Sequence, residues 1–71
     1  MKPTTAYKII QKECDFLGKS FSWVWADIIK HGSMIYSEQA VQAVDVLSDH
    51  CPHTEDLMWF CLQQKIKLNN T

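Results

Sequence analysis

The sequence predicts an all-α fold, a small antiparallel helical bundle of three main helices in which the first helix is long. Three observations support this prediction. Apolar residues recur at helical spacing, capping residues stand where the periodic segments begin and end, and the chain holds only two glycines and two prolines. Seventy-one residues suffice for one domain, so we expect residues 1–71 to form a single helical domain.

The first helix is expected over residues 5–31. A heptad stripe passes Gly18 without losing phase, and one interior glycine costs a helix only about 1 kcal/mol. One continuous helix is therefore favoured, and two helices divided at residues 18–20 are the alternative. Gly32 follows two basic residues and predicts the C-terminal end of this helix. The stripe consists of Ile10, Cys14, Leu17, Phe21, Val24 and Ile28.

Two shorter helices are expected after a loop over residues 32–36. The second helix spans residues 38–50 behind Ser37, and the third spans residues 55–68 behind Thr54, because serine and threonine favour the N-cap position. In the second helix, Ala40 and Ala43 permit close approach. The third helix is expected to turn Leu57, Met58, Cys61, Leu62, Ile66 and Leu68 toward the first helix, with Trp59 and Phe60 extending outward.

The long first helix carries a second apolar stripe. Its members are spaced by seven residues and lie more than about 100° around the helix from the first stripe, whereas Trp25 widens the first stripe and is expected in the core. Two short helices can cover one of these faces, so the other face is free to contact a partner. Tryptophan is enriched at the centres of protein interfaces. The expected interface residues are Ile9, Phe16 and Trp23 of this stripe, and Trp59 and Ile66 of the last helix.

The charge pattern argues against nucleic acid as a partner. Seven lysines and no arginine oppose eight carboxylates, for a net charge of −1, and arginine is the preferred reader of guanine. The segment 38–50 could act as a recognition helix through Gln39 and Gln42, but it also carries acids that repel phosphate. A dimeric DNA-binding transcriptional regulator is therefore only the alternative function.

The sequence also bears on membrane insertion and on cellular compartment. The densest apolar segment, residues 21–29, includes Asp27 and is far too short to cross a membrane, and the N-terminus lacks the pattern of a signal peptide. Three cysteines are an odd count that fits reduced thiols. We therefore expect a cytoplasmic protein without a membrane partner.

One cluster of residues could carry chemistry: His50, Cys51 and His53, with Cys61 further along. These residues lack the regular paired spacing of zinc ligands, so no metal and no cofactor are predicted. A histidine beside Cys51 could activate the thiol, but nothing in the sequence supplies an orienting third group or a substrate loop. We expect no enzymatic activity and no small-molecule substrate.

The segment Ile28-Ile29-Lys30-His31-Gly32, followed by Val41, Val44 and Leu47, resembles the small enterobacterial biofilm and acid-resistance regulators of the AriR type. The resemblance covers about half the chain. It implies a helical dimer, and no function is carried over from it.

The sequence as a whole predicts a non-enzymatic regulatory or protein–protein interaction module. We expect it to act through its apolar, aromatic helix face, as a homodimer, in the manner of an adaptor or an inhibitor. The expected partners are a second copy of the chain, a protein target, or both.

Overall fold

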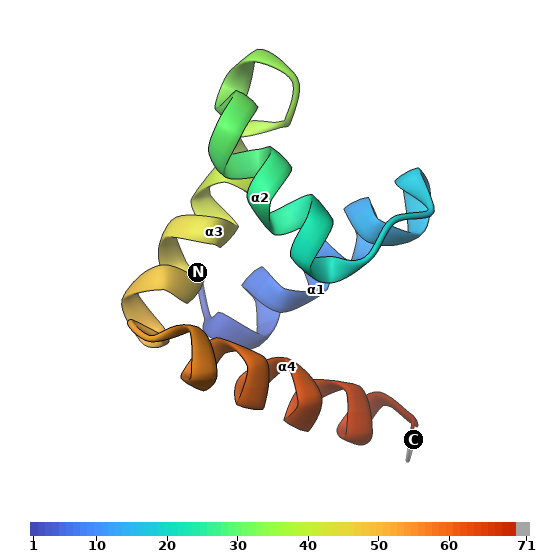
Figure 1. The fold of residues 1–71 in the computed structure, drawn as a ribbon, viewed down its shortest axis with the longest axis vertical. Coiled ribbons are helices and arrows are strands. Elements are labelled where there is room, and N and C mark those ends of the chain that lie inside the picture. Colours follow the sequence, from blue (N-terminus) through green and yellow to red (C-terminus); the bar gives the residue numbers. More distant parts are fainter. Residues whose placement is uncertain (70–71) are drawn as a thin grey trace.

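The computed structural model describes residues 1–69 and confirms the all-α class. Its described part contains four α-helices and one short 3₁₀ helix, which pack into a compact body with a radius of gyration of 11.4 Å (Figure 1). The elements are α1 (Pro3–Leu17), α2 (Phe21–His31), η1 (Gly32–Met34), α3 (Glu38–His50) and α4 (Thr54–Asn69).

The long first helix was a wrong prediction, because the chain breaks at Gly18 into α1 and α2. Gly18 adopts the left-handed conformation, with φ 67° and ψ 32°, and its N–H donates to the carbonyl of Cys14 over 2.8 Å. Ser20 then caps α2, since its hydroxyl accepts from the backbone N–H of Trp23 over 3.3 Å. A left-handed glycine cap followed by a serine N-cap is a stable way to end one helix and start the next.

The end of α2 and the start of α3 follow their predicted signals. Gly32, with φ 57°, ends α2 directly after His31. Ser37 caps α3, and its hydroxyl accepts from the backbone N–H of Ala40 over 3.2 Å. The prediction of Thr54 as an N-cap was wrong, because Thr54 is itself the first residue of α4 and the N–H of Leu57 donates to the carbonyl of His53 over 3.1 Å; the helix ends at Asn69.

The core is centred on the contact between α1 and α3, which is the most extensive contact between elements. Ala6 of α1 and Ala40 and Ala43 of α3 are fully buried, so the two helices approach closely. Ile10 and Leu47 fill the space beside the alanines, and neither has any exposed surface. The close approach predicted from Ala40 and Ala43 is confirmed.

The residues of the heptad stripe face α3 on both sides of the break at Gly18. The apolar pattern therefore continues in phase although the helix does not. Ile10 and Cys14 of α1 and Val24 and Ile28 of α2 are all buried in one cluster. Leu17 lies at the turn and is 39% exposed. Trp25 is partly buried and packs against the core, near its expected place.

The last helix, α4, runs across one end of the molecule, below the other helices in Figure 1. None of its residues is buried. It is attached through Leu57, Phe60 and Cys61, which are partly buried and pack against the core. The prediction for Phe60 was therefore wrong, since its ring faces inward and contacts Tyr7 edge-on at 6.4 Å between centroids.

The break at Gly18 can be tested by mutation, because the two-helix and the one-helix arrangements predict changes in stability of opposite sign. We expect Gly18→Ala to lower the free energy of unfolding by about 1–2 kcal/mol, because an alanine is strained at positive φ. No heavy atom lies within 4 Å of the position of an added Cβ, so crowding does not contribute. In a continuous helix the same change would raise the stability by about 1 kcal/mol. Urea unfolding followed by circular dichroism measures the difference.

Two serine variants complete this test. Ser20→Ala removes the cap of α2 and should lower the free energy of unfolding by about 0.5–2 kcal/mol. Ser33→Ala, at an exposed serine in η1, is the matched control and should change it by less than about 0.5 kcal/mol. Stabilisation by both Gly18→Ala and Ser20→Ala would contradict the two-helix arrangement.

Candidate functional site

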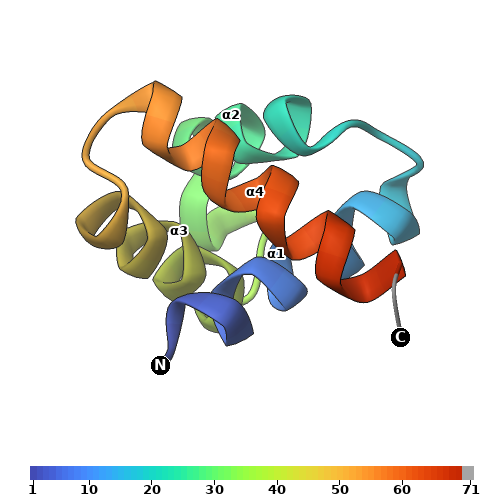
Figure 2. The same cartoon turned by 90° about the horizontal axis from the view of Figure 1, so that it is seen from below.

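The strongest candidate site is the exposed apolar side of α4. Four large apolar residues on it remain exposed: Met58 by 68%, Trp59 by 64%, Leu62 by 48% and Ile66 by 46%. At 100° per residue they fall within one arc of about 100°, and the inward-facing Leu57 and Cys61 lie outside it. We call these four residues the α4 outer face. Viewed from below, α4 crosses the front of the molecule with nothing over it (Figure 2).

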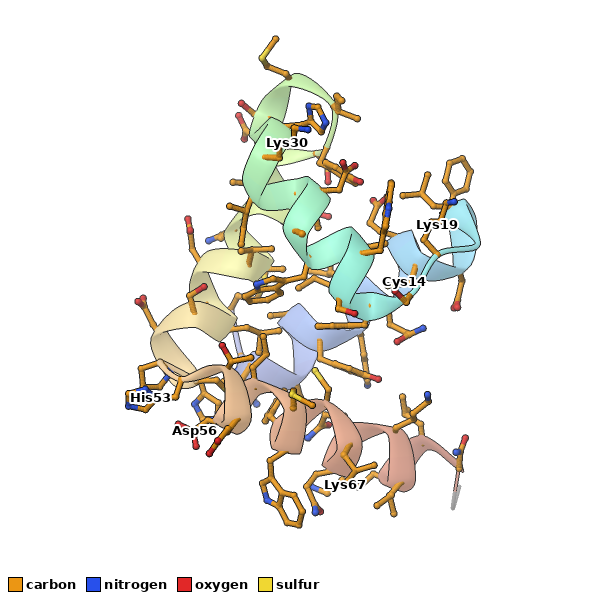
Figure 3. All side chains as sticks on the ribbon, viewed as in Figure 1. Cys14, Lys19, Lys30, His53, Asp56 and Lys67 are labelled. Atoms are coloured by element: carbon orange, nitrogen blue, oxygen red, sulfur yellow. The ribbon has the colours of Figure 1, made fainter. Side chains whose placement is uncertain are left out.

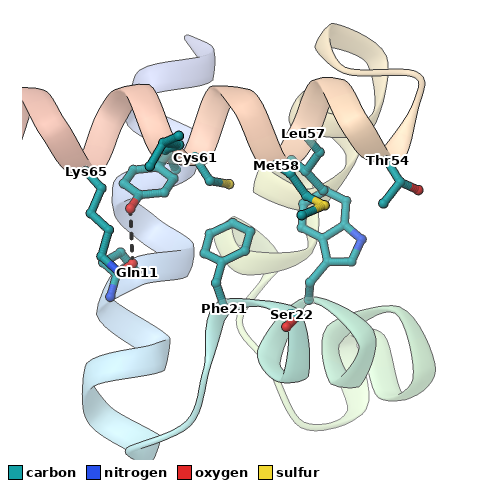
Figure 4. Close-up of a pocket in the computed structure, with 11 residues that line it drawn as sticks. Gln11, Phe21, Ser22, Thr54, Leu57, Met58, Cys61 and Lys65 are labelled. Carbon is teal, nitrogen blue, oxygen red and sulfur yellow. Dashed lines mark hydrogen bonds between the residues drawn. The ribbon is translucent and has the colours of Figure 1, made fainter.

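An apolar groove of about 560 Å³ runs beside this face, between α4 and the α1–α2 pair. Figure 4 shows Gln11 and Lys65 at one end of the groove and Thr54 at the other. The walls are formed by Tyr7, Phe21, Ser22, Trp25, Leu57, Met58, Cys61 and Leu62. Met58 and Leu62 belong both to the groove and to the α4 outer face, so the two form one continuous apolar surface.

Three aromatic rings from α1 and α2 form the wall opposite α4. The rings of Tyr7 and Phe21 stack at 5.5 Å between centroids, and those of Phe21 and Trp25 stack at 6.1 Å. The Tyr7 hydroxyl donates to Oε1 of Gln11 over 3.3 Å, which keeps its polar end at the polar end of the groove. Stacked rings are rigid and present a large apolar area, as binding surfaces require.

The titratable side chains that line the groove are Tyr7, Cys61 and Lys65. Burial raises the pKa of the Cys61 thiol to about 11, with a smaller contribution from the Cys51 and Cys14 thiols. The thiol is therefore protonated at neutral pH and a poor nucleophile. Burial likewise raises the pKa of Tyr7. The described residues that line the groove include no histidine and no carboxylate that could take up a proton.

The structure does not bring the five predicted interface residues together. Trp59 and Ile66 lie on the α4 outer face. Phe16, 85% exposed, lies near the end of α1, and Trp23, 46% exposed, lies in the first turn of α2 with the Lys19 ammonium 5.3 Å from its ring centre. Ile9 is partly buried and packs against the core.

The predicted stripe of Ile9, Phe16 and Trp23 assumed one continuous helix, so the break at Gly18 removes its basis. The sequence analysis turned Met58, Leu62, Ile66 and Leu68 toward the first helix, and this was wrong, since each of them is at least 46% exposed. Of these four, only Ile66 was also expected at the interface. The spacing of Met58, Leu62 and Ile66, four residues at each step, was the available signal.

A polar cluster at the far end of α2 has a structural role. The Tyr36 hydroxyl donates to Asp27, and His31 Nε2 lies 3.3 Å from the other oxygen of that carboxylate. Burial, reinforced by the hydrogen bond to Asp27, raises the pKa of Tyr36 to about 12. The cluster fastens the turn after η1 to α2, and its residues line neither the groove nor the smaller pocket at the α3–α4 turn.

The predicted soft-ligand cluster is dispersed. Cys51 is buried at the end of α3, where its N–H donates to the carbonyl of Leu47 over 2.7 Å. The His50 ring contacts Phe60 edge-on at 5.3 Å, and Figure 3 shows His53 at the outer edge of the turn. Within residues 1–69, no three His, Cys, Asp or Glu side chains are grouped closely enough to hold a metal ion.

The exposed side of α3 carries Glu38, Asp45 and Asp49 around Gln39 and Gln42. Acids in these positions repel the phosphates that a recognition helix must approach. No observation on α3 favours a DNA-binding function.

Comparison with known proteins adds no relative. No protein-family model matches the chain, and neither a curated protein nor a solved structure shows significant similarity to it. Among residues 1–69, none of the helices has both the length and the apolar content needed to cross a membrane.

The raised thiol pKa predicts a loss of stability at alkaline pH. The Cys61 thiol ionises near pH 9.0 when unfolded but near pH 11 in the fold. Its contribution is therefore fully present below pH 9.0 and is lost as the pH rises through about 11. We expect Cys61→Ala to flatten the fall in the free energy of unfolding over this range, measured by urea unfolding at a series of pH values.

Tyr36→Phe provides the comparison, since its effect belongs to the range between pH 10.0 and about 12. It should leave the slope just above pH 9 unchanged. An identical pH profile for the wild type and Cys61→Ala would show that the thiol is as well solvated in the fold as in the unfolded chain.

Proposed function

We propose that this chain is a non-enzymatic protein–protein interaction module of the adaptor or inhibitor type. It acts through the α4 outer face and the groove beside it. The observation that carries the proposal is that α4 exposes four large apolar residues on one side while it buries no residue on the other. Apolar surface concentrated on one helix side, with a tryptophan among its residues, is typical of a protein-binding site.

The groove supports binding more than catalysis. Its walls combine rigid aromatic rings with flexible Met58 and Leu62, a composition that fits an apolar helix or side chain of a partner. Its thiol is protonated at neutral pH. Three unpaired cysteines also favour a reducing compartment, so we propose that the module acts in the cytoplasm.

Site-specific photo-crosslinking in cells tests this proposal. A photoreactive amino acid is placed at position 59 of the full chain, on the α4 outer face. The control position is 34, since Met34 is 91% exposed but lies in η1, at the opposite end of the molecule from α4 (Figure 1). We expect a discrete crosslinked protein product from position 59 and none above background from position 34.

The α4 outer face should be dispensable for folding. Trp59→Glu should therefore lower the free energy of unfolding of the isolated chain by less than about 1 kcal/mol. A cooperative loss of the whole fold in Trp59→Glu would mean that Trp59 belongs to the core, and the absence of any crosslink from position 59 would mean that the face has no protein partner. Either result would overturn the proposed function.

A further inference from the structure

We infer that the apolar groove between α4 and the α1–α2 pair binds a straight-chain carboxylic acid, with the carboxylate at the Lys65 end and the alkyl chain along the aromatic wall. The inference goes beyond the proposed function, because it concerns a small molecule and stands whether or not a protein binds the α4 outer face. Four observations lead to it: the side of α4 that lines the groove, the charge at one end, the length of the groove, and its apolar walls.

One side of α4 forms a wall of the groove along most of the helix. At 100° per residue, Thr54, Met58, Cys61 and Lys65 fall within an arc of about 60°, and all four line the groove. Trp59 lies at least about 100° around the helix from each of them and does not line the groove. The groove and Trp59 can therefore be tested separately.

A single cation stands at one end of the groove. Among the described residues that line it, only Lys65 carries a charge at neutral pH. Lys65 is exposed and forms no ion pair within residues 1–69. Figure 4 shows it beside Gln11, which accepts a hydrogen bond from the Tyr7 hydroxyl. One cation at the end of an apolar groove is complementary to a ligand with a negatively charged head and an apolar body.

The hydrogen-bond donors at this end suit a carboxylate head. The Gln11 amide has two N–H hydrogens, and one of them is used in the bond from Nε2 to Oδ1 of Asp15 over 3.2 Å. The remaining amide hydrogen and the Lys65 ammonium suffice for the two oxygens and the single charge of a carboxylate. A phosphate monoester would bring about two negative charges and three acceptor oxygens. The neighbouring Asp15 would repel that doubly charged head more strongly than a carboxylate.

The length of the groove fits an extended alkyl chain. Thr54 and Lys65 line its opposite ends and are eleven residues apart, roughly 16 Å along α4. A staggered alkyl chain advances about 1.25 Å per C–C bond, so a twelve-carbon acid spans roughly 14 Å. The groove volume of about 560 Å³ lies within the range of roughly 300–1,000 Å³ that is typical of small-molecule sites.

The walls offer apolar contacts along this whole length. Tyr7, Phe21 and Trp25 stand in a row, with successive ring planes inclined by only 22° and 21°. Trp25 marks the Thr54 end, since both residues also line the smaller pocket at the α3–α4 turn. Met58 faces this row from α4, and its unbranched side chain can adapt to the shape of a ligand. The tail of the acid is therefore expected beside Trp25.

Isothermal titration calorimetry of the purified full chain with a series of fatty acids tests the inference. Burial of one methylene is worth about fourfold in affinity. We therefore expect the dissociation constant to fall about threefold to fourfold per methylene from octanoate to dodecanoate. The fall should stop beyond about fourteen carbons, where the chain is as long as the groove.

The Lys65→Gln variant tests the head group. It should raise the dissociation constant of dodecanoate about threefold to tenfold, because the charge that faces the carboxylate is lost. The matched control is Lys67→Gln, the same change at an exposed position of α4 that does not line the groove, and it should alter the constant by no more than about twofold. Decan-1-ol, which has no charge, should bind Lys65→Gln and the wild type equally. Circular dichroism verifies that both variants stay folded.

Brominated acids test the orientation, since bromine quenches tryptophan fluorescence on contact. The variant Trp23→Phe/Trp59→Phe leaves Trp25 as the only tryptophan of the chain. At equal occupancy, 12-bromododecanoate should quench Trp25 strongly, because its bromine lies at the tail. The isomer 2-bromododecanoate carries its bromine at the Lys65 end and should quench weakly.

Three results would overturn the inference: no binding of dodecanoate at millimolar concentration, a Lys65→Gln variant that binds it as tightly as Lys67→Gln, or quenching by 12-bromododecanoate that does not exceed that by its isomer. A crosslink from position 59 would still support the proposed function in each case, since Trp59 lies outside the groove. Acid binding without any crosslink from position 59 would support the inference and overturn the proposed function alone.

Discussion

The close packing of α1 on α3 determines where everything else in this molecule lies. Ala6, Ala40 and Ala43 have no exposed surface and let two helix backbones approach closely, with Ile10 and Leu47 sealing the contact. These alanine side chains are small and offer little apolar surface for a further helix to pack on. The helix α2 closes this core by adding Val24 and Ile28 from the other side of the Gly18 turn, which leaves few large core side chains for α4 to pack on. As a result, α4 rests on the aromatic wall through partly buried residues and keeps an apolar side in solvent.

The fold could be predicted from the sequence where a local signal and the apolar pattern agreed. Gly32, Ser37, Ala40 and Ala43 were read correctly because each has a local role that tertiary packing did not change. Gly18 was misread because a glycine is compatible with both states. An interior glycine costs a helix only about 1 kcal/mol, and a glycine is also the usual residue of a left-handed helix cap. The deciding residue was Ser20, whose hydroxyl starts a new helix only if the first has ended.

The candidate site could be predicted only in part. The excess of apolar surface and the roles of Trp59 and Ile66 as surface residues could be found from spacing, since they depend on α4 alone. The stripe of Ile9, Phe16 and Trp23 could not be judged, because its geometry depended on whether the helix continued through Gly18. The groove was beyond sequence reasoning altogether, as it arises where residues of α1 and α2 meet α4, and helical periodicity gives no information on how separate helices are placed.

The shallow attachment of α4 has a consequence for the folding behaviour of the chain. Because no residue of α4 is buried and its link to α3 is the short turn at Cys51-Pro52-His53, α4 can open as a unit while α1–α3 keep their core. Such sub-global opening requires far less free energy than complete unfolding. The amides of α4 would then exchange with solvent well before those of α1 and α3. A protein that covered the outer face would slow this exchange, because binding only to the closed form stabilises it.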